Sequence, residues 1–361
     1  MPAAPAPSLA DRLPADRRPA LPIWAAPMAG GPSTPELVAA VGAAGGLGFL
    51  AAGYLPADAV EEAIARLTAA WTGPWGINLF VPTPRQGAPD AIAAYAQRLA
   101  PLAERHGVAL GEPRWDDDGF AAKLDVVRAH RPAVVSLTFG VPVPEVIAGV
   151  RDATGAAVVA TVTSVADAVR AEAAGVDALC VQGHEAGGHR SLFADDPADP
   201  EGGPALPLRT LLADVAAATP LPLVAAGGIM TGAGVRGALR AGAQAVQLGT
   251  AFLTTPEAGT SALHRRCLLE GRFAGTVVTR AFTGRPARAL ANVLAREGQD
   301  APAAYPELHH LTRPLRAAAT RAGDADVAHL WAGTGWAAVT DEPAGALVRR
   351  LAHEAGLTPG G

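Results

Sequence analysis

The fold is decided by a stretch in which a short apolar run passes into a glycine-rich polar loop: Ala178-Leu179-Cys180-Val181-Gln182-Gly183-His184-Glu185-Ala186-Gly187-Gly188-His189-Arg190. A segment with a helical pattern precedes it and ends at Ala174-Gly175, where Gly accepts the left-handed conformation that stops a helix. The near-continuous apolar run is typical of a parallel strand buried on both faces. A helix that ends at a glycine, a buried strand and a polar loop together form one unit of a parallel α/β fold.

The same unit recurs along the chain. Apolar runs with the composition of buried strands alternate with helical patterns, and the first helix begins with a capping hydroxyl and a first-turn proline in Ser33-Thr34-Pro35-Glu36. Two further helices stop at Gly45 and Gly242. The predicted strands are 22–29, 47–53, 75–80, 134–140, 157–162, 178–182, 223–229 and 245–252, and the predicted helices are 34–44, 57–69, 91–106, 143–151, 165–174, 208–217 and 233–241.

Eight such units close naturally into a (β/α)8 TIM barrel of the α/β class, with an open doubly wound sheet as the alternative. Residues 258–329, after the eighth strand, are Arg-rich and mostly helical in pattern. We therefore predict an N-terminal extension at 1–21, a barrel at 22–257 and 330–358, and an inserted, mainly helical lobe at 258–329 on the substrate side. The pattern at 344–355 predicts a final helix that returns to the barrel.

Composition excludes several classes of function. A net charge of −5 without basic runs argues against nucleic acid as a partner. No run approaches the ~18 apolar residues of a membrane span, and no secretory signal is recognisable, so we expect a cytoplasmic protein. The two cysteines, Cys180 and Cys267, have no metal-ligand spacing, and no metal site is predicted.

Barrel enzymes place their active site at the carboxyl ends of the strands, often with a phosphate site after strands seven and eight. The corresponding loops here contain Gly227-Gly228 and Gln247-Leu248-Gly249-Thr250, and Thr231-Gly232 opens the next helix. Backbone N–H groups beside Gly and a helix N-terminus both favour an anion. The plainer interpretation is a pair of tight βα turns.

Side chains at three other strand ends suit a planar ligand. Met28 can pack on a ring face or fill the core, and Asn78 offers an amide donor and acceptor or forms a turn. With Gln182 and the two glycine loops, these positions fit flavin mononucleotide (FMN) better than a sugar phosphate.

Taken together, the motifs resemble the nitronate monooxygenase family, formerly called 2-nitropropane dioxygenases. The resemblance spans residues 22–355 in order and rests on Pro27-Met28-Ala29-Gly30-Gly31-Pro32-Ser33-Thr34-Pro35-Glu36-Leu37, Asn78, Gln182-Gly183-x-Glu185-Ala186-Gly187-Gly188-His189-Arg190, Ala226-Gly227-Gly228-Ile229, Gln247-x-Gly249-Thr250, Phe282-Thr283-Gly284-Arg285-Pro286-Ala287-Arg288 and Leu330-Trp331-Ala332-Gly333. Two positions depart from the family pattern: Trp24-Ala25, which can alter the packing of the first strand, and Ser191, which can alter the path of the loop.

The resemblance implies an FMN-dependent barrel enzyme that oxidises alkyl nitronates with O2 to a carbonyl compound and nitrite. It also implies that His189 is the catalytic base, which takes the α-proton of a neutral nitroalkane. The cofactor contacts are then expected at Met28, Asn78, Gln182, Gly187, Gly227, Gly228, Gln247, Leu248, Gly249 and Thr250.

His184 is the weaker candidate for the base, and Glu185 can orient either imidazole ring. We expect the remaining histidines, including His309 and His310, to lie on the surface. The expected partners are a small nitronate and O2, and no pattern indicates an oligomeric state.

Three other functions share these features. The first is an FMN-dependent NAD(P)H:quinone or enoyl-acyl-carrier-protein reductase, which has the same glycine-rich loops. The second is a flavin-free aldolase or isomerase barrel. The third is a binding protein that keeps the scaffold without turnover.

Overall fold

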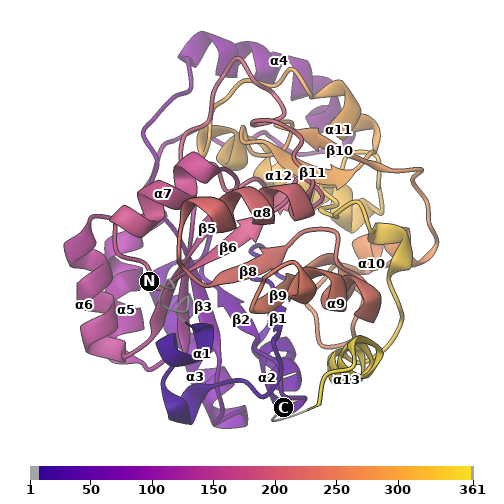
Figure 1. Ribbon diagram of the computed structural model, residues 1–361. Helices are drawn as coiled ribbons and strands as arrows, with labels where there is room; N and C mark the ends of the chain where they lie inside the picture. The colour runs from indigo at the N-terminus through magenta and orange to yellow at the C-terminus, as the bar shows by residue number, and fades with distance from the viewer. Residues whose placement is uncertain (1–7, 359–361) are drawn as a thin grey trace.

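The computed structural model describes residues 8–358 and has a closed parallel barrel at its centre, surrounded by helices (Figure 1). The strands pair in the order β1-β9-β8-β6-β5-β4-β3-β2. A parallel bridge between Trp24 and Leu47 joins the two ends of this sheet and closes it. The strands are β1 (Ile23–Ala25), β2 (Phe49–Ala51), β3 (Gly76–Phe80), β4 (Val134–Thr138), β5 (Ala157–Val162), β6 (Ala178–Gln182), β8 (Leu223–Ala226) and β9 (Ala245–Leu248). The predicted TIM barrel is confirmed.

The helices of the outer ring begin and stop much as the sequence predicts. The Thr34 hydroxyl accepts the N–H of Leu37, and Gly45, Gly175 and Gly242 all have positive φ. The final helix packs between the first and the last of the preceding ring helices. The ring consists of α2 (Pro35–Ala43), α3 (Ala57–Ala70), α5 (Phe120–Ala129), α6 (Pro144–Thr154), α7 (Val165–Ala173), α8 (Leu208–Ala218), α9 (Gly232–Arg240) and α13 (Ala344–Ala355).

One ring helix, α5, was not predicted from the sequence. It begins after Gly119, whose φ is +62°, and it has no side-chain cap to mark its start. The predicted helix at 91–106 exists as α4 (Pro89–Arg105), but Ile92, Tyr95 and Leu99 pack against the lobe. The loop between β3 and β4 therefore contributes one helix to the lobe and one to the ring.

The interior of the barrel is filled by side chains from most of its strands. Trp24, one of the departures from the family pattern, lies there with its ring 5.6 Å from that of Phe49. Leu9 and Leu13, in and after the short helix α1 (Leu9–Arg12), pack in the same cluster. The predicted N-terminal extension thus contributes packing at residues 8–21, where a 3-10 turn, η1 (Ala15–Arg17), follows α1, whereas residues 1–7 lie outside the described part.

The lobe stands beside α4 at one end of the barrel (Figure 1). It is mainly helical, as predicted, but it also contains a small antiparallel sheet in the order β10-β11-β7. Strand β7 (Gly188–His189) belongs to the loop that follows β6, so the sheet joins the glycine-rich loop to the lobe. The other elements are α10 (Ala262–Leu269), β10 (Thr276–Thr279), β11 (Ala287–Leu290), α11 (Val293–Glu297) and α12 (Glu307–Ala322).

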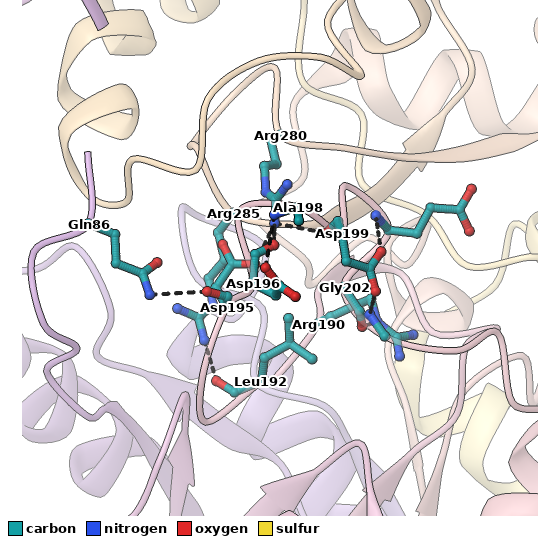
Figure 2. Close-up of polar contacts among 12 residues, drawn as sticks. Gln86, Arg190, Leu192, Asp195, Asp196, Ala198, Asp199, Gly202, Arg280 and Arg285 are labelled. Atoms are coloured by element: carbon teal, nitrogen blue, oxygen red, sulfur yellow. Dashed lines mark hydrogen bonds and ion pairs between the residues drawn. The ribbon is translucent and has the colours of Figure 1, made fainter. Parts of the chain in front are cut away.

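A buried ion pair holds the chain after β7 to the lobe (Figure 2). A terminal nitrogen of Arg280 lies 2.6 Å from the Asp195 carboxylate and also donates to the carbonyls of Asp196 and Asp199. Gln86, from the loop before α4, donates to the carbonyl of Asp195. Three segments far apart in sequence therefore meet around this ion pair.

Candidate active site

A cavity of about 510 Å³ lies between the carboxyl ends of the strands and the lobe. This volume is within the usual range for small-molecule and cofactor sites. Every residue predicted for the site lines it: Met28, Asn78, Gln182, Gly187, His189, Gly227, Gly228, Gln247, Leu248, Gly249 and Thr250. The structure thus brings the predicted residues together, and their individual roles stay a prediction.

One end of the cavity is walled by backbone. Gly228 has a φ of +67°, and a Cβ there would lie 2.9 Å from Cβ of Glu185. A Cβ on Gly187 would lie 2.5 Å from the backbone nitrogen of Gly333. Only glycine fits where these loops touch, and peptide groups are left bare towards the cavity.

Thr250 adds a hydroxyl to this end of the cavity. Its Oγ1 accepts the N–H of Gly333 at 2.9 Å, so the hydroxyl proton is free to donate to a ligand. Bare peptide N–H groups and a hydroxyl donor are the groups that bind phosphate. The glycine-rich end of the cavity therefore fits a phosphate group.

The helix N-terminus predicted to help with the anion does not do so. The N–H of Gly232 at the start of α9 donates to the Glu354 carboxylate of α13, and that of Gly234 donates to Thr231. Neither Thr231 nor Gly232 lines the cavity. The prediction was wrong because the carboxylate of a neighbouring ring helix already occupies the positive end of α9.

Asn78 and Gln182 differ in which side-chain atoms remain free to bind a ligand. The Asn78 amide nitrogen donates to the hydroxyls of Ser136 and Thr138, both at 2.9 Å, which fixes the side chain and leaves its oxygen for a ligand. Gln182 uses both ends of its amide within the protein: it donates to the His189 carbonyl and accepts from the N–H of Ser191. Asn78 can therefore bind a ligand edge, whereas Gln182 shapes the loop.

His189 lies on β7, half-buried, on the lobe side of the cavity. Its Nε2 is 2.9 Å from Oγ1 of Thr283, and its ring contacts those of Phe139 and Trp331 at 5.6 and 5.4 Å between centroids. Burial, then the nearby Arg285 and Arg316 guanidinium groups, lower its pKa to about 3. The imidazole is therefore neutral near pH 7, so one of its ring nitrogens bears a lone pair.

His184 and Glu185 are engaged elsewhere. Nδ1 of His184 lies 3.2 Å from an Arg190 nitrogen, and His184 does not line the cavity. The Glu185 carboxylate accepts the N–H of Leu208 at the start of α8, with 3.1 and 3.0 Å to its two oxygens. The prediction that Glu185 orients a histidine was wrong, because it caps a helix instead.

Ser191, the second departure from the family pattern, is fully buried. Its hydroxyl donates to the Thr161 carbonyl at 3.0 Å and accepts the N–H of Phe139 at 3.1 Å. It therefore ties the loop after β7 to the ends of two barrel strands.

The lobe and the segment after it contribute cavity residues that were not predicted for the site, namely His264, Thr320, Arg321, His329 and Trp331. Arg321 is the one formally charged side chain among the described lining residues. Only Trp331 had any sequence signal, as part of the run Leu330 to Gly333. The others come from three segments that folding brings together.

The prediction that His309 lies on the surface was wrong. Its side chain is buried and stacks on Tyr54, with 3.9 Å between ring centroids and 6° between planes. Tyr54 in turn lines the cavity. His310 is partly buried and pairs with Asp116 at 2.8 Å. The tertiary contact between α12 and the end of β2 determines this burial, and no local pattern marks it.

The closed barrel, its backbone cradle and the histidine opposite define a cofactor-binding (β/α)8 enzyme. A sequence model described as nitronate monooxygenase matches residues 16–354, and the chain belongs to the nitronate monooxygenase family, which is flavin-dependent. A nitronate monooxygenase of Paraburkholderia phytofirmans is 40% identical over 92% of each chain.

Two solved structures extend the comparison. A nitroalkane oxidase from Streptomyces ansochromogenes has a TM-score of 0.91 and 49% identity, covering 96% of this chain and 98% of that chain. FabK from Thermotoga maritima has a TM-score of 0.65 and 26% identity, covering 96% and 95%. Among residues 8–358, no helix is long and apolar enough to cross a membrane.

Proposed function

We propose that this protein oxidises alkyl nitronates with O2, using FMN, and yields a carbonyl compound and nitrite. One observation carries the proposal: a cavity with a backbone phosphate cradle at one end is also lined by a neutral histidine on β7, the strand that pairs with the lobe. The family membership and the likeness to a nitroalkane oxidase support it.

FMN fits the residues that line the cavity. Gly227, Gly228, Gly249 and Thr250 would hold the phosphate, and Asn78 would bind the edge of the ring system. When bound, FMN supplies the redox chemistry, taking electrons from the nitronate and passing them to O2. The protein contributes binding, orientation and proton transfer.

His189 would act on the neutral form of the substrate. A nitroalkane must lose its α-proton before it becomes a nitronate, and a neutral imidazole lining the cavity can take it. A preformed nitronate needs no base. Arg321, whose cation reaches the cavity wall, favours the approach of an anionic substrate.

Oxygen consumption and nitrite release test the proposal directly. The FMN-loaded protein is mixed with ethylnitronate in air, and we expect O2 uptake with stoichiometric nitrite. The absence of both, with FMN bound, would contradict the proposal.

The likeness to FabK favours one alternative, a reductase that takes hydride from NAD(P)H. Anaerobic mixing with NADH separates the two functions. Rapid bleaching of the flavin absorbance by NADH, without oxygen uptake on nitronates, would establish the reductase instead.

A further inference from the structure

The backbone of His189 is held mainly by the lobe. His189 pairs with Ala287 across the β7–β11 ladder, and the N–H of Arg190 donates to the Pro286 carbonyl at 2.9 Å. Gln182 donates to the His189 carbonyl at 3.0 Å. The loop that leads into β11 therefore sets the position of this histidine.

The same loop contacts the His189 ring through Thr283. Thr283 is 1% exposed, and its Oγ1 lies 2.9 Å from Nε2. Nδ1 of the same ring has no hydrogen-bond partner within residues 8–358. It is nevertheless not fully enclosed by protein atoms. Because His189 lines the cavity, Nδ1 is the nitrogen that a ligand can reach.

The hydrogen-bond partners of Thr283 decide which nitrogen carries the proton. A threonine hydroxyl has one proton to donate and can also accept. Its oxygen lies 3.4 Å from the carbonyl oxygen of Arg285, which can only accept. When the hydroxyl proton points to that carbonyl, Oγ1 accepts from Nε2–H of His189, and Nδ1 keeps its lone pair.

We propose that Thr283 is a positioning residue that holds His189 in the Nε2–H tautomer, so that Nδ1 takes the α-proton of the substrate. This rests on the proposed function. In the step, the Nδ1 lone pair forms the new N–H bond and the C–H bond breaks. Its electron pair moves into the nitro group and gives the nitronate anion. The resulting imidazolium still donates Nε2–H to Thr283.

Thr283→Val and Thr283→Ser test the role in turnover. Valine keeps the shape and removes the hydroxyl, whereas serine keeps the hydroxyl. With nitroethane we expect Thr283→Val to lower kcat/KM by about 10- to 100-fold, a part of what a general base contributes. With ethylnitronate, which needs no base, we expect little change, and Thr283→Ser should restore turnover of nitroethane.

Thr279→Val is the matched control. Thr279 is also buried in the lobe; its hydroxyl donates to the Gly298 carbonyl at 3.3 Å and accepts the N–H of Ala281 at 3.1 Å, and neither bond involves His189. We expect its ratio of nitroethane to ethylnitronate activity to equal that of the wild type. An equal loss on both substrates in Thr283→Val would mean a structural role and overturn the proposal.

A second readout does not depend on turnover. ¹⁵N NMR of the FMN-loaded protein distinguishes a protonated imidazole nitrogen from a bare one, and the His189 signals are assigned by their loss in His189→Gln. We expect Nε2–H and a bare Nδ1 in the wild type, and a mixture of tautomers in Thr283→Val. Nδ1–H in the wild type would overturn the proposal even if Thr283→Val failed to fold.

The two proposals fail in different ways. A wild type that consumes no O2 with ethylnitronate contradicts the proposed function, whereas the NMR result still decides the tautomer. An active wild type whose substrate ratio is unaffected by Thr283→Val contradicts only the role of Thr283.

Discussion

The barrel and the lobe build opposite walls of one cavity with different chemistry. On the barrel side the wall is largely peptide backbone, left bare by Gly187, Gly227 and Gly228. On the lobe side it consists of side chains such as His264, His329 and Trp331. The barrel wall suits a fixed cofactor, and the lobe wall suits a variable substrate.

This difference explains why the lobe wall can be changed more easily than the barrel wall. A backbone cradle depends on the absence of Cβ atoms, so almost any substitution harms it. A side-chain wall tolerates replacement wherever shape and polarity are kept. Substitutions made in one wall at a time therefore test this comparison.

The largest expected effect comes from breaking the junction between loop and lobe. In the pair of Arg280 and Asp195 the side chains are 2% and 3% exposed. Removing one partner leaves a buried charge without compensation, which costs about 3–5 kcal/mol. We expect Arg280→Ala to lower the free energy of unfolding by this amount in denaturant titration.

Arg98→Ala is the control for this substitution. Arg98 pairs with Asp300 on the surface, where the side chains are 45% and 72% exposed. Exposed pairs contribute less than about 1 kcal/mol. If both variants lost equally little stability, the buried pair would not hold the lobe in place.

A smaller effect is expected from closing the backbone cradle. In Gly187→Ala the new Cβ would lie 2.5 Å from the nitrogen of Gly333, and backbone cannot move aside as a flexible side chain does. Overpacking of this kind costs about 1–3 kcal/mol. We expect the purified variant to retain less FMN, measured by its absorbance after gel filtration.

Gly237→Ala provides the comparison for the cradle. Gly237 lies within α9, and a Cβ there meets nothing within 4 Å. Alanine should stabilise the helix by about 1 kcal/mol without changing FMN content. Equal FMN loss in both variants would show that the loss does not depend on the close contact at Gly187.

Sequence could predict the barrel wall because each part of it is local. Gly227-Gly228 and Gly249-Thr250 follow apolar runs directly, and the ends of parallel strands must meet at one edge of a barrel. The lobe wall could not be predicted in this way. The contact of Thr283 with His189 joins residues 94 apart in sequence, and the stacking of Tyr54 on His309 also depends on tertiary packing.

The burial of histidines in the lobe predicts a dependence of stability on pH. Burial lowers the pKa of His264 to about 4. The unfolded chain therefore binds a proton that the folded protein does not, between about pH 6.5 and 4. Stability is full above this window and is lost as pH falls through it, by up to about 1.4 kcal/mol per pH unit for each such histidine.

Denaturant titrations across this pH window measure the effect. We expect His264→Gln to reduce the slope of stability against pH, and His353→Gln, at an exposed position on α13, to leave it unchanged. An unchanged slope in His264→Gln would mean that His264 can be protonated in the folded protein.

The central claim is that the lobe presents His189, and not His184, to a substrate on the barrel-bound cofactor. The most direct test is the ratio of kcat/KM for nitroethane to that for ethylnitronate in His189→Ala and His184→Ala. We expect this ratio to fall by roughly 100- to 10,000-fold in His189→Ala, the usual contribution of a general base, and to stay at the wild-type value in His184→Ala. A ratio that falls in His184→Ala but not in His189→Ala would contradict the account.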